Sequence, residues 1–174
     1  MNQHDWRTTL LRPVWAEVDL DAIAHNIRQI TNLIGPSVRL YAALKGDGYG
    51  HGCVETARAV LQAGAHGLAV ANLYECLEIR QAGVTAPVLL YAGTPGYLAE
   101  VVVRYAITPT ITDLDAAVEF SRHAPEGYGV FVKIDSGLER AGIYAEDALP
   151  VIRAVAGLPH LRVEGVYTHM HCGS

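Results

Sequence analysis

The fold class depends on residues 38–52, which read VRLYAALKGDGYGHG. Residues 38–44 are mostly apolar and predict a β-strand that ends at Leu44. Glycines at positions 46, 48, 50 and 52 then predict a tight turn. A helix is predicted over residues 51–63, closed by Gly64. A strand, a glycine-rich turn and a helix in this order form one unit of a parallel α/β fold.

The same unit recurs along the chain. Strands are predicted at residues 38–44, 67–71, 87–91, 106–111, 129–134 and 161–168, after an opening strand segment at residues 14–19. Helices are predicted at residues 20–34, 51–63, 73–82, 96–105, 112–123 (with Thr112 as N-cap) and 146–156. Strands that alternate with helices indicate βαβ units and a parallel sheet.

Two closures of this sheet fit the spacing. The 174 residues suffice for one domain, but a complete (β/α)₈ barrel typically needs about 250. Six strands could complete a doubly wound open sheet instead, although the glycines of residues 46–52 do not fit the GxGxxG turn of dinucleotide-binding folds. Spacing alone leaves both closures open.

Composition excludes several classes of function. The 13 basic and 18 acidic residues give a net charge of −5 without any basic block, which argues against nucleic-acid binding. No apolar stretch approaches the roughly 18 residues of a membrane span. Residues 1–12 lack the apolar region of a secretory signal and are interpreted as an N-terminal extension. Three cysteines without a CxxC pair indicate a reducing, cytoplasmic location; they are Cys53, Cys76 and Cys172.

Polar side chains follow three of the predicted strands. Lys45 directly follows the first strand, residues 133–140 lie at and after the end of the fifth strand, and His169 directly follows the last strand. The carboxyl ends of parallel strands meet at one edge, so these groups are expected to form the active site. A partly desolvated lysine there can act as an amine nucleophile and form a Schiff base. The remaining strand ends are interpreted as bland; they carry Asn72, Thr94 and Thr112.

Four segments then resemble the alanine racemase family. Residues 45–52, KGDGYGHG, are similar to its pyridoxal-phosphate lysine motif, Lys-Ala-(Asn/Asp)-Ala-Tyr-Gly-His-Gly. Residues 133–142, KIDSGLERAG, resemble its Lys-x-Asp-Thr-Gly-Met-x-Arg-Leu-Gly segment. Residues 16–26 resemble its first strand and helix, and residues 165–169 resemble a later strand end. The resemblance covers the chain from Pro13 onward and favours the barrel over the open sheet.

The resemblance also implies roles. Lys45 would hold pyridoxal phosphate as an internal aldimine and act as one catalytic base, and Tyr49 would contact the cofactor phosphate. Arg140 would hydrogen-bond the phenolic oxygen of the cofactor and help bind the substrate carboxylate. His169 would lie against the pyridine ring. Lys133 occupies the place where some members carry a carbamylated lysine that orients the arginine.

The family is larger than this chain. We therefore expect residues 13–174 to be the N-terminal part of a pyridoxal-phosphate-binding barrel, about six of eight strand–helix units, with the C-terminal β-domain absent. The expected reaction interconverts L- and D-alanine, or a related small amino acid, for cell-wall precursors. The full-length enzyme is expected to be a homodimer whose partner subunit supplies a tyrosine as second base. Without that base and the later phosphate loops, the 174 residues alone should have little activity.

Alternative functions remain open at this point. A single-domain pyridoxal-phosphate homeostasis protein would carry the cofactor without racemase activity. A barrel amino-acid decarboxylase would share a lysine at the first strand end, but its following sequence does not resemble residues 49–52. The cluster His169, His171 and Cys172 could bind a metal, but no second cluster supplies further ligands, so no metal site is predicted.

Overall fold

Parallel strands alternate with helices along residues 14–171, the part of the chain that the computed structural model describes. The strands are β1 (Tyr41–Ala43), β2 (Gly67–Val70), β3 (Val88–Gly93), β4 (Thr108–Ile111), β5 (Tyr128–Asp135), β6 (Ile143–Tyr144) and β7 (Leu161–Thr168). The helices are α1 (Leu20–Ile34), α2 (Lys45–Gly50), α3 (Cys53–Gln62), α4 (Leu73–Gln81), α5 (Ala99–Arg104), α6 (Leu114–His123) and α7 (Ala145–Ala156), with a 3₁₀ turn η2 (Gly96–Leu98) before α5. The N-terminal extension predicted for residues 1–12 lies outside the described residues.

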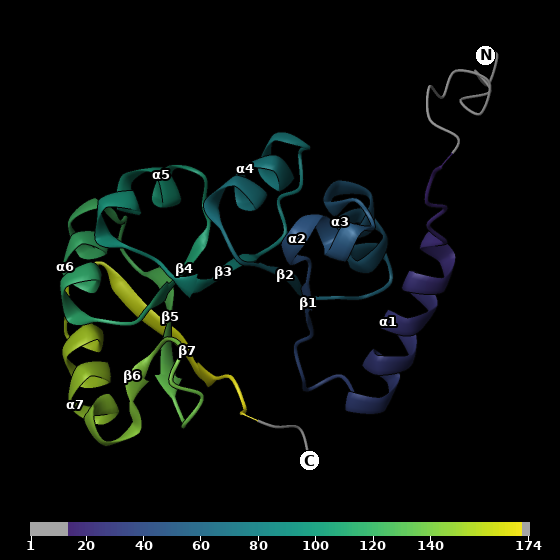
Figure 1. The fold of residues 1–174 in the computed structure, drawn as a ribbon. Coiled ribbons are helices and arrows are strands. Elements are labelled where there is room, and N and C mark those ends of the chain that lie inside the picture. The colour runs from purple at the N-terminus through teal and green to yellow at the C-terminus, as the bar shows by residue number, and fades with distance from the viewer. Residues whose placement is uncertain (1–13, 172–174) are drawn as a thin grey trace.

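The sheet is parallel throughout. Its strands follow the order β1-β2-β3-β4-β5, and β7 pairs with the other edge of β5 along almost its whole length. The two-residue strand β6 pairs only with Ile134 and Asp135 at the carboxyl end of β5. In Figure 1 the strands lie in the middle, and α3 to α7 surround them on the outside. Helix α1 packs on α3, away from the strands.

Aromatic side chains on the inner face show that the sheet is curved. The ring centroids of Tyr41 in β1 and Phe131 in β5 are 6.2 Å apart, whereas these strands would be about 19 Å apart in a flat sheet. The hydroxyl of Tyr167 in β7 donates to the carbonyl of Tyr91 in β3 at 2.7 Å and lies 2.9 Å from the hydroxyl of Thr110 in β4. The sheet therefore bends around a shared interior as an incomplete (β/α) barrel, and the open-sheet alternative is wrong.

The main core lies between the strands and the surrounding helices. Every residue of β2 is buried, as expected for a parallel strand covered on both faces. The largest fully buried apolar side chains are Leu68, Val70, Ile79, Val88, Val102, Ile107, Ile111, Phe120, Val130, Val132 and Val155. On the inner face Gly165 makes room for an aromatic ring, because a Cβ there would lie 2.5 Å from Phe131. Within residues 14–171, no helix is long and apolar enough to cross a membrane.

Three local predictions need correction. Residues 14–19 are irregular rather than a strand, and Asp19 serves as the N-cap of α1 by accepting from the backbone N–H of Ala22 at 3.0 Å. The N-cap of α6 is Asp113, not Thr112; its carboxylate accepts from the N–H of Ala116 at 2.7 Å. Strand β6 was not predicted, because its two residues carry no strand pattern of their own. The six strands predicted after residue 37 are all present.

Candidate active site

Lys45 follows β1 at the carboxyl edge of the sheet. The preceding residue, Leu44, is buried, and its N–H donates to the carbonyl of Ala69 in β2 at 2.9 Å. The side chain of Lys45 is exposed, and its Nζ lies 5.7 Å from the ring centroid of Tyr49. The predicted partial desolvation of Lys45 is therefore not found. The structure brings Lys45 and Tyr49 together, with the amine accessible from outside.

The turn after Lys45 is left-handed. Residues 46–49 all have positive φ, between 55° and 62°, with ψ between 34° and 51°. Gly46 and Gly48 adopt this conformation without steric strain because they have no Cβ. At Asp47 and Tyr49 the same conformation costs about 1–2 kcal/mol of stability each. Within this turn the ring of Tyr49 lies beside the amine of Lys45.

Hydrogen bonds around the turn offset this strain. The N–H of Gly48 donates to the carbonyl of Leu44 at 2.8 Å, and the carboxylate of Asp47 accepts from the N–H of Cys53, the first residue of α3, at 2.6 Å. His51 lies 2.7 Å from the carbonyl of Gly48 through its Nδ1. His51 thus contacts the backbone of the turn.

The sequence suggested that the end of β2 carries no functional side chain, but the structure shows a hydrogen-bond network there. Asn72 caps α4 by accepting from the N–H of Glu75 at 3.0 Å, and Glu75 reaches back to the N–H of Asn72 at 3.3 Å. The same carboxylate accepts from the N–H of Ala71 at 2.8 Å and from the N–H of Gly46 at 2.7 Å. The Asn-x-x-Glu pattern is the signal of a capping box. It could have identified the cap, but not the contact with Gly46.

Lys133 lies in the interior, unlike Lys45. Lys133 is only 4% exposed. Its Nζ lies 5.8 Å from the ring centroid of Tyr167, the residue that pairs with it in β7. Burial, together with the positive charge of Arg140, lowers the pKa of Lys133, and the carboxylate of Asp135 partly opposes this. The positive charges of Lys133 and Arg140 therefore repel each other.

Asp135 organises the loop that carries Arg140. One carboxylate oxygen accepts from the N–H groups of Gly137 at 2.9 Å and Glu139 at 3.0 Å, and the other accepts from the N–H of Arg140 at 2.9 Å. These backbone donors, that of Glu139 first, hold the pKa of Asp135 below its usual value. Gly142 allows the loop to return, because a Cβ there would lie 2.6 Å from the backbone nitrogen of Asp135. No motif in the sequence indicated this role of Asp135.

His169 directly follows β7 and is exposed. The neighbouring hydroxyls of Thr168 and Ser136 are 2.8 Å apart, which ties the end of β7 to the loop that carries Arg140. His169 thus directly follows the strand end that contacts this loop. Cys172, the third member of the metal alternative, lies outside the described residues.

The predicted site residues therefore form two groups. Lys45 and Tyr49 stand at the end of β1, and Lys133, Arg140 and His169 stand at the ends of β5 and β7. Among residues 14–171, no hydrogen bond or ion pair joins the two groups. The rings of Tyr41 in β1 and Phe131 in β5 meet across the interior between the two strands.

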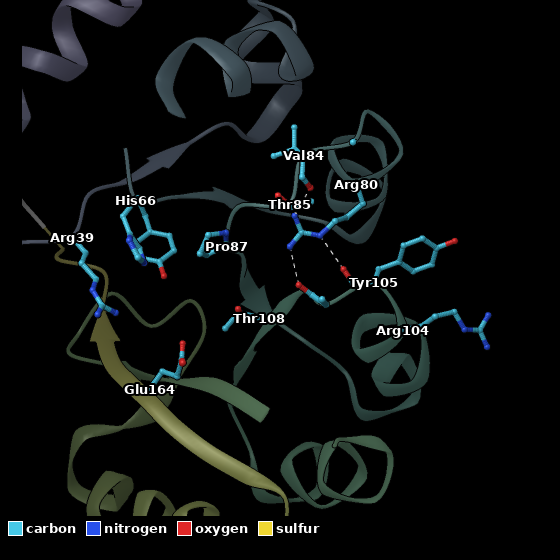
Figure 2. A pocket seen from close by; sticks show the side chains of 13 residues that line it. Arg39, His66, Arg80, Val84, Thr85, Pro87, Arg104, Tyr105, Thr108 and Glu164 are labelled. Carbon is cyan, nitrogen blue, oxygen red and sulfur yellow. Dashed lines mark hydrogen bonds between the residues drawn. The ribbon is translucent and has the colours of Figure 1, made fainter. Parts of the chain in front are cut away.

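A cavity of about 630 Å³ lies at the opposite, amino end of the strands. Its walls include Arg39 and His66, which precede β1 and β2, and Glu164. Figure 2 shows Arg80 on its other side, where the guanidinium donates to the carbonyls of Val84, Ala86, Tyr105 and Ala106 at 2.8–2.9 Å. Arg80 thus joins the loops after α4 and α5. The amino face of such barrels usually serves stability, and these contacts agree with that role.

The fold and the site define a (β/α)-barrel chain whose lysine, arginine and histidine side chains gather at the carboxyl ends of the strands. The family model described as alanine racemase, N-terminal domain, matches residues 18–174. The chain belongs to the alanine racemase family.

Curated relatives and solved structures agree with this family. Alanine racemase 1 of Oceanobacillus iheyensis is 38% identical over 94% of this chain, and alanine racemase of Desulforamulus reducens is 42% identical over 90%. The chain spans 44% of the length of each. Alanine racemase of Clostridium difficile superposes with a TM-score of 0.86 at 34% identity, over 92% of this chain and 45% of that one. Alanine racemase of Bacillus anthracis with bound L-Ala-P superposes with a TM-score of 0.83 at 36% identity, over 92% of this chain and 42% of that one.

Proposed function

We propose that the protein carrying this chain is a pyridoxal-phosphate-dependent racemase of alanine or a related small amino acid, with Lys45 as the residue that holds the cofactor. The observation that carries the proposal is the exposed Lys45 amine beside Tyr49, at the end of β1. Family membership supports it, and the Bacillus anthracis relative has been solved with bound L-Ala-P.

The residues at the carboxyl ends fit the chemistry of the cofactor, which carries an aldehyde, a phosphate and a phenolic oxygen. Lys45 offers an exposed amine, Tyr49 an exposed hydroxyl and Arg140 an exposed guanidinium. Added Cβ atoms at Gly46 and Gly50 would meet nothing within 4 Å. A bound group could therefore approach the backbone of the turn closely.

Each residue has a role in this proposal. When bound, pyridoxal phosphate supplies an electron-accepting ring that stabilises the charge left on the substrate Cα after proton removal. Lys45 holds the cofactor through Nζ and, as a neutral amine, accepts the α-proton from one face. Arg140 pairs with the substrate carboxylate and the phenolic oxygen through its planar guanidinium. Tyr49 contacts the phosphate, and His169 lies against the ring.

Lys133 is assigned the task of orienting Arg140. Lys133 is buried, and the positive charge of Arg140 acts on its amine. Its lowered pKa increases the fraction of the amine that is neutral. A neutral amine is the form that can be carbamylated, and a carbamate would turn a repulsive neighbour of Arg140 into an attractive one. We therefore propose carbamylation of Lys133 in the natural protein.

Racemisation also needs a base on the opposite face of the substrate. We propose that residues 13–174 form the N-terminal part of the barrel, and that a tyrosine from a C-terminal β-domain of a partner subunit supplies this base in a homodimer. We also place the protein in the cytoplasm, where D-alanine enters cell-wall precursors. The free thiols of Cys53 and Cys76, whose pKa values burial raises to about 11 and about 12, are compatible with a reducing compartment.

The test combines a spectrum with isotope exchange. Pyridoxal phosphate added to the protein should give an absorbance band near ~420 nm that Lys45→Ala abolishes and Lys133→Met retains. The natural protein carrying this chain should then exchange the Cα hydrogen of alanine in D₂O and form D-alanine from L-alanine. A band without exchange would indicate a cofactor carrier, and carbon dioxide release would indicate a decarboxylase. The absence of a band at saturating cofactor would refute the proposal.

A further inference from the structure

Glu75 contacts two strand ends at once. One carboxylate oxygen accepts from the N–H groups of Ala71 and Asn72, directly after β2. The other accepts from the N–H of Gly46 at 2.7 Å, directly after Lys45 and 29 residues away in the sequence. A capping-box glutamate needs only the N-cap N–H to complete its helix. The bond to Gly46 is therefore additional to helix capping.

This bond completes the fixation of the Lys45 backbone. On one side, the N–H of Leu44 donates to the carbonyl of Ala69 in β2. On the other side, Glu75 holds the N–H of Gly46. Both anchors belong to the β2–α4 segment, so Lys45 is bound to the neighbouring strand unit on each side. Its position then does not depend on its own exposed side chain.

Glu75 also holds the start of the left-handed turn. Gly46 is the first of five consecutive residues with positive φ, and within this turn the Lys45 amine lies 5.7 Å from the centroid of the Tyr49 ring. Asp47 holds the other end of the turn through the N–H of Cys53. A conformation that L-residues disfavour persists only when its surroundings fix it, and Glu75 provides one of the side-chain anchors.

We propose that Glu75 is a positioning residue for Lys45: its carboxylate clamps the backbone after Lys45 to the end of β2 and so aims the amine at the cofactor. This role rests on the proposed function, because it concerns the reaction of Lys45 with pyridoxal phosphate. It differs from a purely structural role in one measurable way. Loss of the clamp slows the attachment of the cofactor more than the loss of stability explains.

The test compares three variants. Glu75→Ala removes both acceptors, whereas Glu75→Gln keeps one oxygen that can accept from Gly46. Asn72→Ala is the matched control, because it removes the side-chain cap of α4 but leaves the Glu75 carboxylate in place. For each variant, the rate of pyridoxal-phosphate attachment to Lys45 is measured after borohydride reduction, together with the melting temperature.

Attachment should be roughly 10- to 100-fold slower in Glu75→Ala, with Glu75→Gln closer to the wild type. Asn72→Ala should lose melting temperature but attach at the wild-type rate. Equal attachment rates in Glu75→Ala and Asn72→Ala would overturn the positioning role. Equal losses in Glu75→Gln and Glu75→Ala would also count against it.

Amide hydrogen exchange of the peptide that contains residues 45–52 gives a second readout that needs no cofactor. The exchange should be roughly 10-fold faster in Glu75→Ala than in Asn72→Ala, because only the first variant frees the N–H of Gly46. Equal exchange in both would overturn the clamp. If the wild type exchanges slowly but never attaches the cofactor, the proposed function fails while the clamp itself stands.

Discussion

Lys45 and Lys133 are the two lysines of the sequence, and the structure holds them in opposite ways. Lys45 is exposed at the start of a strained left-handed turn, and side chains from other elements fix its backbone. Lys133 is buried within β5, where the ladder with β7 fixes it and the ring of Tyr167 lies beside its amine. An exposed amine on a fixed backbone can react with a ligand, whereas a buried amine can orient a neighbour. The two positions therefore suit different roles in one site.

The largest effect is expected from the interior on the Lys133 side. Phe131 lies two residues before Lys133 on the same face, with its ring between those of Tyr41 and Tyr167. Phe131→Ala should lower the free energy of unfolding by about 2–4 kcal/mol, measured by urea denaturation. Tyr97→Ala, at a residue that is 84% exposed, is the control and should change it by less than about 0.5 kcal/mol. Equal losses in both variants would mean that the inner face contributes no packing.

The next largest loss of stability is expected when the hydrogen bonds of the Tyr167 hydroxyl across the interior are removed. Tyr167→Phe keeps the ring beside Lys133 but leaves the carbonyl of Tyr91 and the hydroxyl of Thr110 without this partner. We expect a loss of about 1–2 kcal/mol in the free energy of unfolding. Tyr74→Phe, at a residue that is 85% exposed, should have no measurable effect. An unchanged stability in Tyr167→Phe would refute the cross-interior bonds.

A smaller effect concerns the charge of Lys133. Because burial lowers its pKa, the native chain binds this proton less tightly than the unfolded chain. The contribution of Lys133 to stability therefore rises with pH up to the ordinary lysine pKa of 10.5. Lys133→Met should remove this rise, so the wild type should gain stability relative to the variant between pH 7 and pH 10, measured by urea denaturation. A difference independent of pH would contradict the burial of the amine.

The smallest effect is expected on the Lys45 side. Gly46 has a φ of +62°, and an added Cβ would meet nothing within 4 Å. Gly46→Ala adds backbone strain but also restricts the unfolded chain, so the free energy of unfolding should change by about 1 kcal/mol or less. The related family motif carries alanine at this position, which agrees with a small effect. A loss above about 3 kcal/mol would show that the turn cannot accept a side chain.

Much of the fold follows from the sequence because the strands of a parallel sheet are short apolar runs between helices. The strand predicted at residues 161–168 and the helix at residues 20–34 have the observed bounds. Residues 14–19 carry a similar β-branched pattern but pair with no strand, since pairing depends on a neighbour that the pattern does not encode. Strand β6 depends on the return of the loop at Gly142, which is likewise a tertiary effect.

The positions of the candidate site residues in the fold were predictable from the sequence, but their environment was not. The strand pattern placed Lys45, Arg140 and His169 after predicted strands, and each follows a strand in the structure. It could not show that Lys45 is exposed and Lys133 buried, because exposure depends on the curvature of the sheet. Glu75 was overlooked because its bond to Gly46 joins residues 29 positions apart. Their roles in catalysis stay predictions.

The most direct test of the account asks which lysine reacts. The chain is incubated with pyridoxal phosphate, reduced with borohydride, digested and mapped by mass spectrometry. Since the sequence contains only two lysines, the result is a choice between two peptides. The exposed Lys45 should carry the cofactor, and the buried Lys133 should not. Modification of Lys133 with Lys45 unmodified, or of neither, would contradict the assignment of the site.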